Sequence, residues 1–413
     1  MNEEQNINQL PKDWKWVKLG EACNIIMGQS PPSTSYNADG IGLPFFQGKA
    51  EFTDLYPIVE KWCNAPNKIA EPNDILLSVR APVGTTNIAN QKCCIGRGLA
   101  AIRYENYKYA FYFLRSRQQE LDSKGTGTTF RAISGETIRE TLFPFPPKPI
   151  QQVIVSKIEE LFSELDKGIE NLRSAQQQLK TYRQAVLKWA FEGKLTNENL
   201  KEGELPKGWK MLKTIDVIKI INNGYTPTSQ YLSQDSGEVP FIKVYNLNFE
   251  GSLNFKKNPT FIPLANHKKD LKRSICLPGD VLINIVGPPL GKVSVVTNQY
   301  PEWNINQAIV MFRPNEKVMS KYISYFMQNS VTINWLENTS KATAGQWNVK
   351  VSTCREIPFP FCSVKDQNKI IQEIESRLSV ADKMEESITQ SLQQAEALRQ
   401  SILKKAFEGR LIK

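Results

Sequence analysis

Apolar side chains recur at helical spacing in two long stretches of the chain, which we place at residues 151–195 and 367–413. Successive apolar positions are mostly three, four or seven residues apart, and Gln, Glu, Lys and Arg fill the positions between them. This spacing is typical of a heptad repeat, so it predicts one long helix in each stretch. The stripes consist of Ile154, Ile158, Leu161, Leu165, Leu172, Leu179, Tyr182 and Val186, and of Ile370, Ile374, Ala381, Met384, Ile388, Ala395, Leu398 and Ile402.

The rest of the chain has short apolar runs that are interrupted by Pro, Gly and Asn. Runs at 75–79 and 281–286 predict buried strands, and the patterns at 107–119 and 320–329 predict short amphipathic helices. We therefore expect one mixed α/β globular domain at residues 1–150, a second at 205–366, and a linker at 196–204.

The chain contains an internal repeat, which is the strongest signal in the sequence. LPKDWKWVKL at residues 10–19 returns as LPKGWKMLKT at 205–214, and AFEGKL at 190–195 returns as AFEGRL at 406–411. Gly193 and Gly409 follow the last turn of each predicted helix and suit a left-handed C-cap.

A long helix with a single apolar stripe has to bury that stripe, and this stripe occurs twice in one chain. An intramolecular antiparallel pair is the simplest solution, although each helix could instead pack only on its own globular domain. The sequence thus predicts an α+β fold. It has two mixed α/β domains separated by two long antiparallel coiled-coil helices, with a pseudo-twofold repeat.

Composition narrows the functional classes. The net charge of +10 and pI of about 9.1 favour a polyanionic partner such as nucleic acid. No run of about 18 apolar residues is present, and the polar N-terminal sequence has no secretion signal, so we expect a cytoplasmic protein without membrane contact. The seven cysteines form no CxxC pair and there is one histidine, so we expect no metal site.

Few residues are candidates for catalysis. The single histidine, His267, stands among lysines, and we expect an exposed loop residue rather than a catalytic base. Neither G-x-x-x-x-G-K-[ST] nor G-x-G-x-x-G occurs, so no cofactor is expected. PNDILLSVR and PGDVLINIV resemble a nuclease carboxylate strand but lack its acid-x-Lys partner, and we interpret both as ordinary strands.

The stretch GQSPPSTSY at residues 28–36 resembles the tetrapeptide that holds a flipped adenine in N6-adenine methyltransferases. Ser33 stands where that tetrapeptide needs an aromatic ring. In the second repeat the stretch becomes Gly224-Tyr225-Thr226-Pro227, which keeps only the glycine, a hydroxyl and one proline. These residues are typical of a turn, so we interpret the stretch as the entrance to a globular domain.

Taken together, these motifs resemble the specificity subunit of type I restriction-modification enzymes over essentially the whole chain. The resemblance rests on the repeated LPKxW openings, PFIKVYNL at 240–247, the two strand motifs above and the repeated IQQVIVSKIEELFSELDK…LKWAFEGKL helices. It implies a non-catalytic reader of double-stranded DNA in which each globular domain recognises one half of a split, asymmetric target. It also implies that the helices set the gap between the two half-sites and dock two modification subunits, which methylate adenine. Restriction subunits would join this core.

The segments KGTGTTFRA at 124–132 and KATAGQWNVK at 341–350 combine small, hydrogen-bonding and basic residues, which suits contact with a duplex. The alternative is a pair of surface turns, with Phe130 and its counterpart Trp347 anchoring them. Our first candidates for DNA contact are Lys124, Thr128, Thr129, Arg131, Lys341, Thr343, Gln346 and Lys350. Second candidates are Lys243, Tyr245, Asn246, Arg80, Arg97, Lys292, Asn306 and Gln307.

Other interpretations stay open at this point. The chain could be a structural coiled-coil adaptor, or a self-sufficient DNA methyltransferase or nuclease. Apolar residues off the main stripe could meet modification subunits or pack on their own globular domains. These residues are Phe162, Ile169, Trp189, Phe191, Leu378, Leu392 and Phe407.

Overall fold

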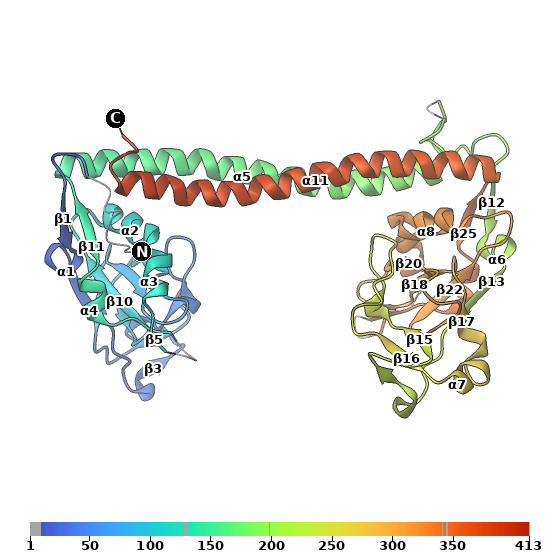
Figure 1. Ribbon diagram of the computed structural model, residues 1–413, viewed down its shortest axis with the longest axis horizontal. Coiled ribbons are helices and arrows are strands. Elements are labelled where there is room, and N and C mark those ends of the chain that lie inside the picture. The colour runs from blue at the N-terminus through green and yellow to red at the C-terminus, as the bar shows by residue number, and fades with distance from the viewer. Residues whose placement is uncertain (1–9, 128–130, 198, 341, 344–345, 413) are drawn as a thin grey trace, which may run out of the picture. The chain divides into compact units, whose positions relative to one another are not determined.

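The computed structural model describes residues 10–127, 131–197, 199–340, 342–343 and 346–412. They form two compact units (Figure 1). The first unit extends to Arg173 and resumes at Thr389, and the second is Ser174–Ile388. Each unit therefore holds one globular domain together with parts of both long helices, α5 (Lys148–Phe191) and α11 (Val364–Phe407).

A four-stranded, a five-stranded and a two-stranded sheet build the globular part of the first unit. Their strand orders are β2-β10-β7-β8, β3-β5-β4-β9-β6 and β1-β11. The strand predicted at 75–79 is β7, whose residues are all buried, as a short continuous apolar run requires. The bounds are β1 Lys15–Lys18, β2 Asn24–Met27, β3 Tyr36–Asn37, β4 Leu43–Phe46, β5 Trp62–Cys63, β6 Ile69–Ala70, β7 Ile75–Ser78, β8 Thr86–Ile88, β9 Cys93–Ile95, β10 Leu99–Arg103 and β11 Leu142–Phe145.

The second unit repeats this topology strand for strand, with the orders β13-β22-β18-β20, β14-β16-β15-β21-β17 and β12-β25. It adds the small sheet β19-β24-β23. The pairs β4–β9 and β15–β21 are both parallel, which confirms the internal duplication at the level of register. The bounds are β12 Lys210–Lys213, β13 Ile220–Asn223, β14 Ser233–Gln234, β15 Val239–Ile242, β16 Thr260–Ile262, β17 Ile275–Cys276, β18 Val281–Asn284, β19 Val286–Gly287, β20 Val293–Val295, β21 Trp303–Ile305, β22 Ile309–Arg313, β23 Ala342–Thr343, β24 Gln346–Asn348 and β25 Pro358–Phe361.

Short helices flank the sheets. The helix predicted at 107–119 is divided at Arg117 into two helices, α2 and α3, whereas the helix predicted at 320–329 is the single helix α8. The bounds are α1 Leu19–Ala22, α2 Tyr107–Ser116, α3 Gln118–Ser123, α4 Gly135–Arg139, α6 Thr214–Val217, α7 Leu264–Lys268, α8 Ser320–Gln328, α9 Ser330–Asn338 and α10 Val351–Arg355. Single 3₁₀ turns are η2 Ser33–Ser35, η3 Lys49–Glu51, η4 Ser229–Tyr231, η5 Val244–Asn246 and η6 Lys272–Ser274.

The end of a long helix from the other repeat completes the core of each globular domain. In the first unit, Phe407 of α11 packs edge-on against Tyr109 and Phe113 of α2. In the second unit, Phe191 of α5 packs in the same way against Tyr322 and Phe326 of α8. Neither repeat therefore builds its main core from its own residues alone.

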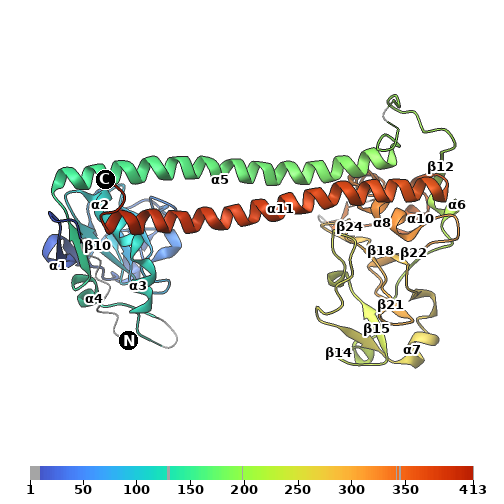
Figure 2. The same cartoon turned by 45° about the horizontal axis from the view of Figure 1, so that its top comes forward.

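The two long helices run antiparallel within each unit (Figure 2). In the first unit, Asp166 of α5 forms an ion pair with Arg399 of α11, whose guanidinium also lies 4.6 Å from the Phe162 ring centroid. In the second unit, Arg183 of α5 binds Asp382 and Glu385 of α11, with N–O distances of 2.7 and 2.9 Å. The expected antiparallel pair is thus confirmed in both units.

The apolar stripe is buried most fully at the helix ends, where globular side chains cover it. Ile154, Ile158, Val186, Ile370, Ile374 and Ile402 belong to the two main cores. Nearer the middle of the helices, however, Met384 and Leu398 stay 53% and 50% exposed and Tyr182 is 36% exposed. Near the middle of the helices the stripe is therefore covered only in part, because two helices alone cover a narrow strip.

Off-stripe residues of the helices divide into two groups. Phe162 is buried in the core of its own globular domain and Leu378 packs against the core of its own, so for these two the globular-packing alternative is correct. Phe191 and Phe407 are buried in the globular core of the other repeat, which neither alternative anticipated. Trp189 is 41% exposed, and Ile169 and Leu392 are half-buried.

Gly193 and Gly409 have φ values of +78° and +71°, which confirms the predicted left-handed caps. Among the described residues, no helix combines the length and apolar character needed to cross a bilayer.

Candidate nucleic-acid interface

Five chain segments meet at one edge of the first globular domain. We call residues 28–31, 46–48, 79–81, 96–99 and 131–133 the first loop cluster. Backbone hydrogen bonds join these segments. The amides of Gly96, Val79, Ala81 and Ile133 donate to the carbonyls of Phe46, Gly98, Arg131 and Val79, with N–O distances of 2.8, 2.9, 2.9 and 3.0 Å. These bonds fix the position of backbone segments that are far apart in the sequence.

The second domain contains an equivalent second loop cluster, formed by residues 224–227, 242–244, 285–287, 305–309 and 347–349. The amides of Asn306, Ile285 and Val349 donate to the carbonyls of Ile242, Ala308 and Ile285, with distances of 3.1, 2.9 and 2.9 Å. Gly287 pairs with Trp347 as Ala81 does with Arg131. The structural partner of Trp347 is therefore Arg131, whereas the sequence alignment placed Phe130 there.

The GQSPPSTSY stretch contributes its first four residues to the first loop cluster and holds the neighbouring segment 96–99. The amide of Gly28 donates to Leu99 O, and the Ser30 hydroxyl accepts a hydrogen bond from the amide of Arg97 at 3.2 Å. A Cβ at Gly28 would stand 2.2 Å from the carbonyl oxygen of Gly96, so only glycine fits. Gly224 and Thr226 repeat both features, with 2.1 Å to Ile305 O and 3.3 Å from the Thr226 hydroxyl to the amide of Gln307.

Sequence reasoning did not assign these two hydroxyls to the site. The usable signal was the Gly-x-hydroxyl-Pro pattern that survives in both repeats while its surroundings change.

Several predicted contact residues lie in or beside the first loop cluster. Arg80 and Arg97 are exposed, and neither forms an ion pair with any residue that the structure describes. Lys124 and Arg131 are also exposed, but they bind Glu120 at 2.6 Å and Asp122 at 3.6 Å. Thr128 and Thr129 lie outside the described residues, as does Phe130.

In the second domain, Gln307 and Lys350 are exposed, and Lys350 occupies the N-cap of α10. The carbonyl oxygen of the Asn306 side chain is buried and has no hydrogen-bond partner among the described residues. The backbones of Thr343 and Gln346 pair with each other between β23 and β24, and Lys341 lies outside the described residues. Trp347 packs against the main core, as an anchoring residue should.

Other predicted residues are engaged within the protein. Asn246 is fully buried; its Oδ1 accepts from the Lys243 amide at 2.9 Å, and its Nδ2 donates to the carbonyls of Asn254 and Lys257. Its role in this structure is therefore to hold its loop together. The Tyr245 hydroxyl lies 3.0 Å from Asn258 O. The ammonium groups of Lys243 and Lys292 lie over the rings of Tyr245 and Phe249, at 6.0 and 5.9 Å.

The two strand motifs contain buried carboxylates with structural partners. Asp74 accepts two hydrogen bonds from Arg103 at 2.7 and 2.8 Å and one from the amide of Glu71. Asp280 has the same partners in the second repeat, Arg313 and the amide of Leu277. These hydrogen bonds raise the pKa of both arginines. Both motifs are strands, as predicted, and their acids anchor β10 and β22.

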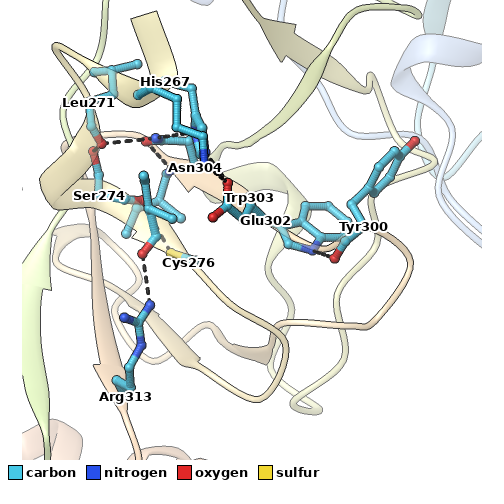
Figure 3. A network of polar contacts seen from close by, with 12 residues as sticks. His267, Leu271, Ser274, Cys276, Tyr300, Glu302, Trp303, Asn304 and Arg313 are labelled. Atoms are coloured by element: carbon cyan, nitrogen blue, oxygen red, sulfur yellow. Dashed lines mark hydrogen bonds and ion pairs between the residues drawn. The ribbon is translucent and has the colours of Figure 1, made fainter. Parts of the chain in front are cut away.

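The prediction for His267 was wrong, because this residue is fully buried. Asn304 Nδ2 donates to His267 Nδ1 at 3.1 Å, so His267 Nε2 donates to Glu302, also at 3.1 Å (Figure 3). Lys268 binds the same carboxylate at 2.6 Å. Hydrogen bonds from Lys268 and then His267 lower the pKa of Glu302. The side chains of Lys268 and Lys269 are exposed. The imidazole is buried against Glu302 and Asn304, which lie about 35 residues further along the chain.

Two further results concern chemistry. Among the described residues, no group of three His, Cys, Asp or Glu side chains could hold a metal ion. The cysteines are free and buried, and burial raises the pKa of Cys23, Cys93 and Cys354 to about 12. These thiols therefore stay protonated near neutral pH and pack as small apolar groups.

Comparison with known proteins shows which family this chain is similar to. The model of the type I restriction modification DNA specificity domain matches residues 11–172 and again residues 206–396. A putative MjaX specificity subunit of Methanocaldococcus jannaschii is 39% identical over 199 residues, which cover 47% of this chain and 46% of that protein. The type I restriction enzyme EcoBI specificity subunit of Escherichia coli is 25% identical, over 99% of this chain and 89% of that protein.

Solved structures share the fold. A chain from a study of complex assembly and conformational transition in the type I R-M system has a TM-score of 0.71 at 20% identity, covering 98% of this chain and 100% of the other. The HsdS subunit from Thermoanaerobacter tengcongensis has a TM-score of 0.58 at 19% identity, with 98% and 99% covered. Because the family model matches both repeats and most of the sequence, the chain belongs to the family of type I restriction modification DNA specificity domains.

Proposed function

We propose that this chain is the non-catalytic, DNA-reading subunit of a type I restriction-modification complex. The observation that carries the proposal is the pair of loop clusters, which share one backbone frame and expose different side chains. Each cluster would read one half of a bipartite, asymmetric target in double-stranded DNA. Lysine and arginine contacts to phosphates would position the protein, and a few side chains would read base edges.

The basic side chains of the loop clusters divide into two kinds under this proposal. Arg80 and Arg97 are unpaired among the described residues and are available to the duplex as they stand. Lys124 and Arg131 would exchange Glu120 and Asp122 for phosphates, which is favourable because phosphates on DNA attract cations strongly. We leave Asn246 out of the contact set because its amide is used within the protein.

The long helices have a separate role in the proposal. They would set the gap between the two half-sites and dock two modification subunits, which methylate adenine N6, with restriction subunits joining that core. Tyr182, Met384 and Leu398 leave apolar surface on the helices that a partner helix could cover. The proposed division is 1–150 and 205–366 for recognition, 151–195 and 367–413 for spacing, and 196–204 as linker. The free cysteines fit a reducing, cytoplasmic setting.

The decisive experiment is co-expression of the chain with its modification subunits in a host that lacks N6-methyladenine, followed by genome-wide mapping of that base. We expect one bipartite, asymmetric motif. Replacing residues 1–150 with those of another family member should change one half-site and leave the other intact. An unchanged motif after that exchange would favour a structural adaptor whose globular domains do not touch DNA.

Two controls test the remaining parts. The purified chain alone, supplied with S-adenosylmethionine and DNA, should transfer no methyl group, and transfer would contradict the non-catalytic assignment. Deleting four residues from α5 and the four that oppose them in α11 shortens the helices by roughly 6 Å at 1.5 Å per residue. We expect the gap to change by one or two base pairs and both half-sites to stay the same.

A further inference from the structure

Positions 97 and 307 are structurally equivalent. Each backbone amide donates to a hydroxyl of the entrance turn, from Ser30 in one domain and Thr226 in the other. The preceding amides donate to the ends of β4 and β15, and the following residues accept from Val79 and Ile285. All three backbone contacts are thus conserved between the repeats, while the side chain changes from Arg97 to Gln307.

The backbone at these positions has little freedom to move. In the first cluster, a Cβ at Gly28 would stand 2.2 Å from Gly96 O, and a Cβ at Gly98 would stand 2.3 Å from Gln47 O. The loop that carries Arg97 is therefore packed backbone against backbone on both sides. A fixed backbone adds no cost of ordering the loop on binding and holds the side chain at a defined position, which favours selective contact with a base.

The two side chains suit different bases. A guanidinium offers two parallel donors that match O6 and N7 of guanine, whereas a carboxamide offers a donor and an acceptor that match N7 and N6 of adenine. We propose that Arg97 selects a guanine in one half-site and that Gln307 selects an adenine in the other. The inference rests on the proposed DNA-reading function and adds the identity of one base in each half.

The surroundings of the two side chains agree with this assignment. No described carboxylate forms an ion pair with Arg97, whereas Lys124 and Arg131 of the same region bind acids. Next to Gln307, the side-chain carbonyl oxygen of Asn306 is buried and has no hydrogen-bond partner among the described residues, so the second cluster contains two adjacent amide side chains.

The test compares the methylation motifs of the full chain and its variants, each co-expressed with the modification subunits. Arg97→Gln should relax or convert one G·C pair in a single half-site, with a preference change of about 5- to 150-fold at that pair. Gln307→Arg should convert one A·T pair in the other half-site. In each variant the half-site read by the unaltered domain should stay the same.

Matched controls lie at the opposite ends of the same strands. Lys92→Gln removes one exposed charge just before β9, where Lys92 binds Glu71 at 3.1 Å, and Gln299→Arg adds one exposed charge before β21. Both should leave the motif unchanged. Arg97→Lys should keep the guanine because lysine can also donate to it, whereas Arg97→Met should lose it. These two variants preserve the test if Arg97→Gln lowers the melting temperature of the complex.

The outcomes separate the inference from the function beneath it. A bipartite motif that neither Arg97→Gln nor Gln307→Arg alters would overturn the base assignment and leave the proposed function in place. A uniform loss at all sites with Arg97→Gln would mean a phosphate contact and would also overturn it. Absence of any motif with the unaltered chain would remove the proposed function itself.

Discussion

The two loop clusters differ in the side chains that they expose and agree in the backbone contacts that hold them. Ser30 and Thr226 make the same hydrogen bond, and Gly28 and Gly224 leave the same space for a carbonyl oxygen. In contrast, Arg97 of the first cluster occupies the position equivalent to Gln307 of the second, and Arg131 the position equivalent to Trp347. The comparison teaches that duplication preserved a rigid support and left the exposed positions free to diverge, which is how one fold can serve two different half-sites.

The strongest way to break the comparison is to remove the aromatic residue that each repeat inserts into the other domain. Phe407→Ala and Phe191→Ala should each destabilise one unit by about 3–5 kcal/mol, because both side chains are buried among other rings. Urea denaturation followed by circular dichroism measures the loss, and limited proteolysis shows which unit opens. Leu398→Ala, in the exposed part of α11, is the control and should change stability by less than about 0.5 kcal/mol. Equal effects of Phe407→Ala and Leu398→Ala would contradict the described core.

The buried acids sharpen the comparison, because their arginine partners differ in exposure. Asp280→Ala should cost about 3–5 kcal/mol, since Arg313 is only 18% exposed and would remain largely buried without its carboxylate, keeping the Ile275 carbonyl as an acceptor. Asp74→Ala should cost less, because Arg103 is 43% exposed and stays hydrated. The same denaturation experiment checks both variants. A larger loss for Asp74→Ala would show that burial does not decide the difference.

The entrance turn offers a test of intermediate size. Gly28→Ala places a methyl group against a backbone oxygen and should destabilise the first unit by about 1–3 kcal/mol. Gly48→Ala is a matched control in the same cluster, because its φ of −171° is extended and no atom lies within 4 Å of the added Cβ. Thermal unfolding should therefore separate the two variants. If both unfold at the same temperature, the turn does not constrain the loop.

The smallest expected effect comes from the His267–Glu302–Lys268 network, which the first unit lacks at the equivalent strand because Cys94 stands in the place of Asn304. The pKa of Glu302 is lowered in the folded protein, so its contribution is present above the ordinary value of 4.5 and is lost as pH falls through the folded value. Glu302→Gln should flatten the acid side of the stability profile of the second unit. Denaturation midpoints measured between neutral and acid pH would show the flattening, and an unchanged acid profile would mean that other carboxylates determine it.

Local patterns predicted much of this fold. The periodic apolar stripes gave two long helices, the repeated motifs gave the two domains, and the compact apolar runs gave β7 and β18, because each depends on residues close together in the sequence. The prediction for His267 was wrong for the opposite reason. Its burial depends on Glu302 and Asn304, which approach it only through strand order.

The candidate site was predicted unevenly for the same reason. Basic and hydrogen-bonding residues in loops indicated Arg97 and Gln307, but nothing local separated them from Asn246, whose similar chemistry is used internally. The equivalence of positions 97 and 307 became visible only through hydrogen bonds between distant segments, since gaps in the repeat obscure the register.

The left-handed glycines that end the long helices also close the chain on itself. Gly193 packs against Pro206 and Gly409 packs against Pro11, and the two prolines hold the same place in the repeated LPK motif. The end of α11 therefore meets the first domain in the same way as the end of α5 meets the second domain. The contacts between the helices and the domains thus form a cyclic arrangement with two equivalent junctions, Gly193–Pro206 and Gly409–Pro11. A permuted chain that begins near residue 200 and joins the present ends through a short linker should keep every contact described above.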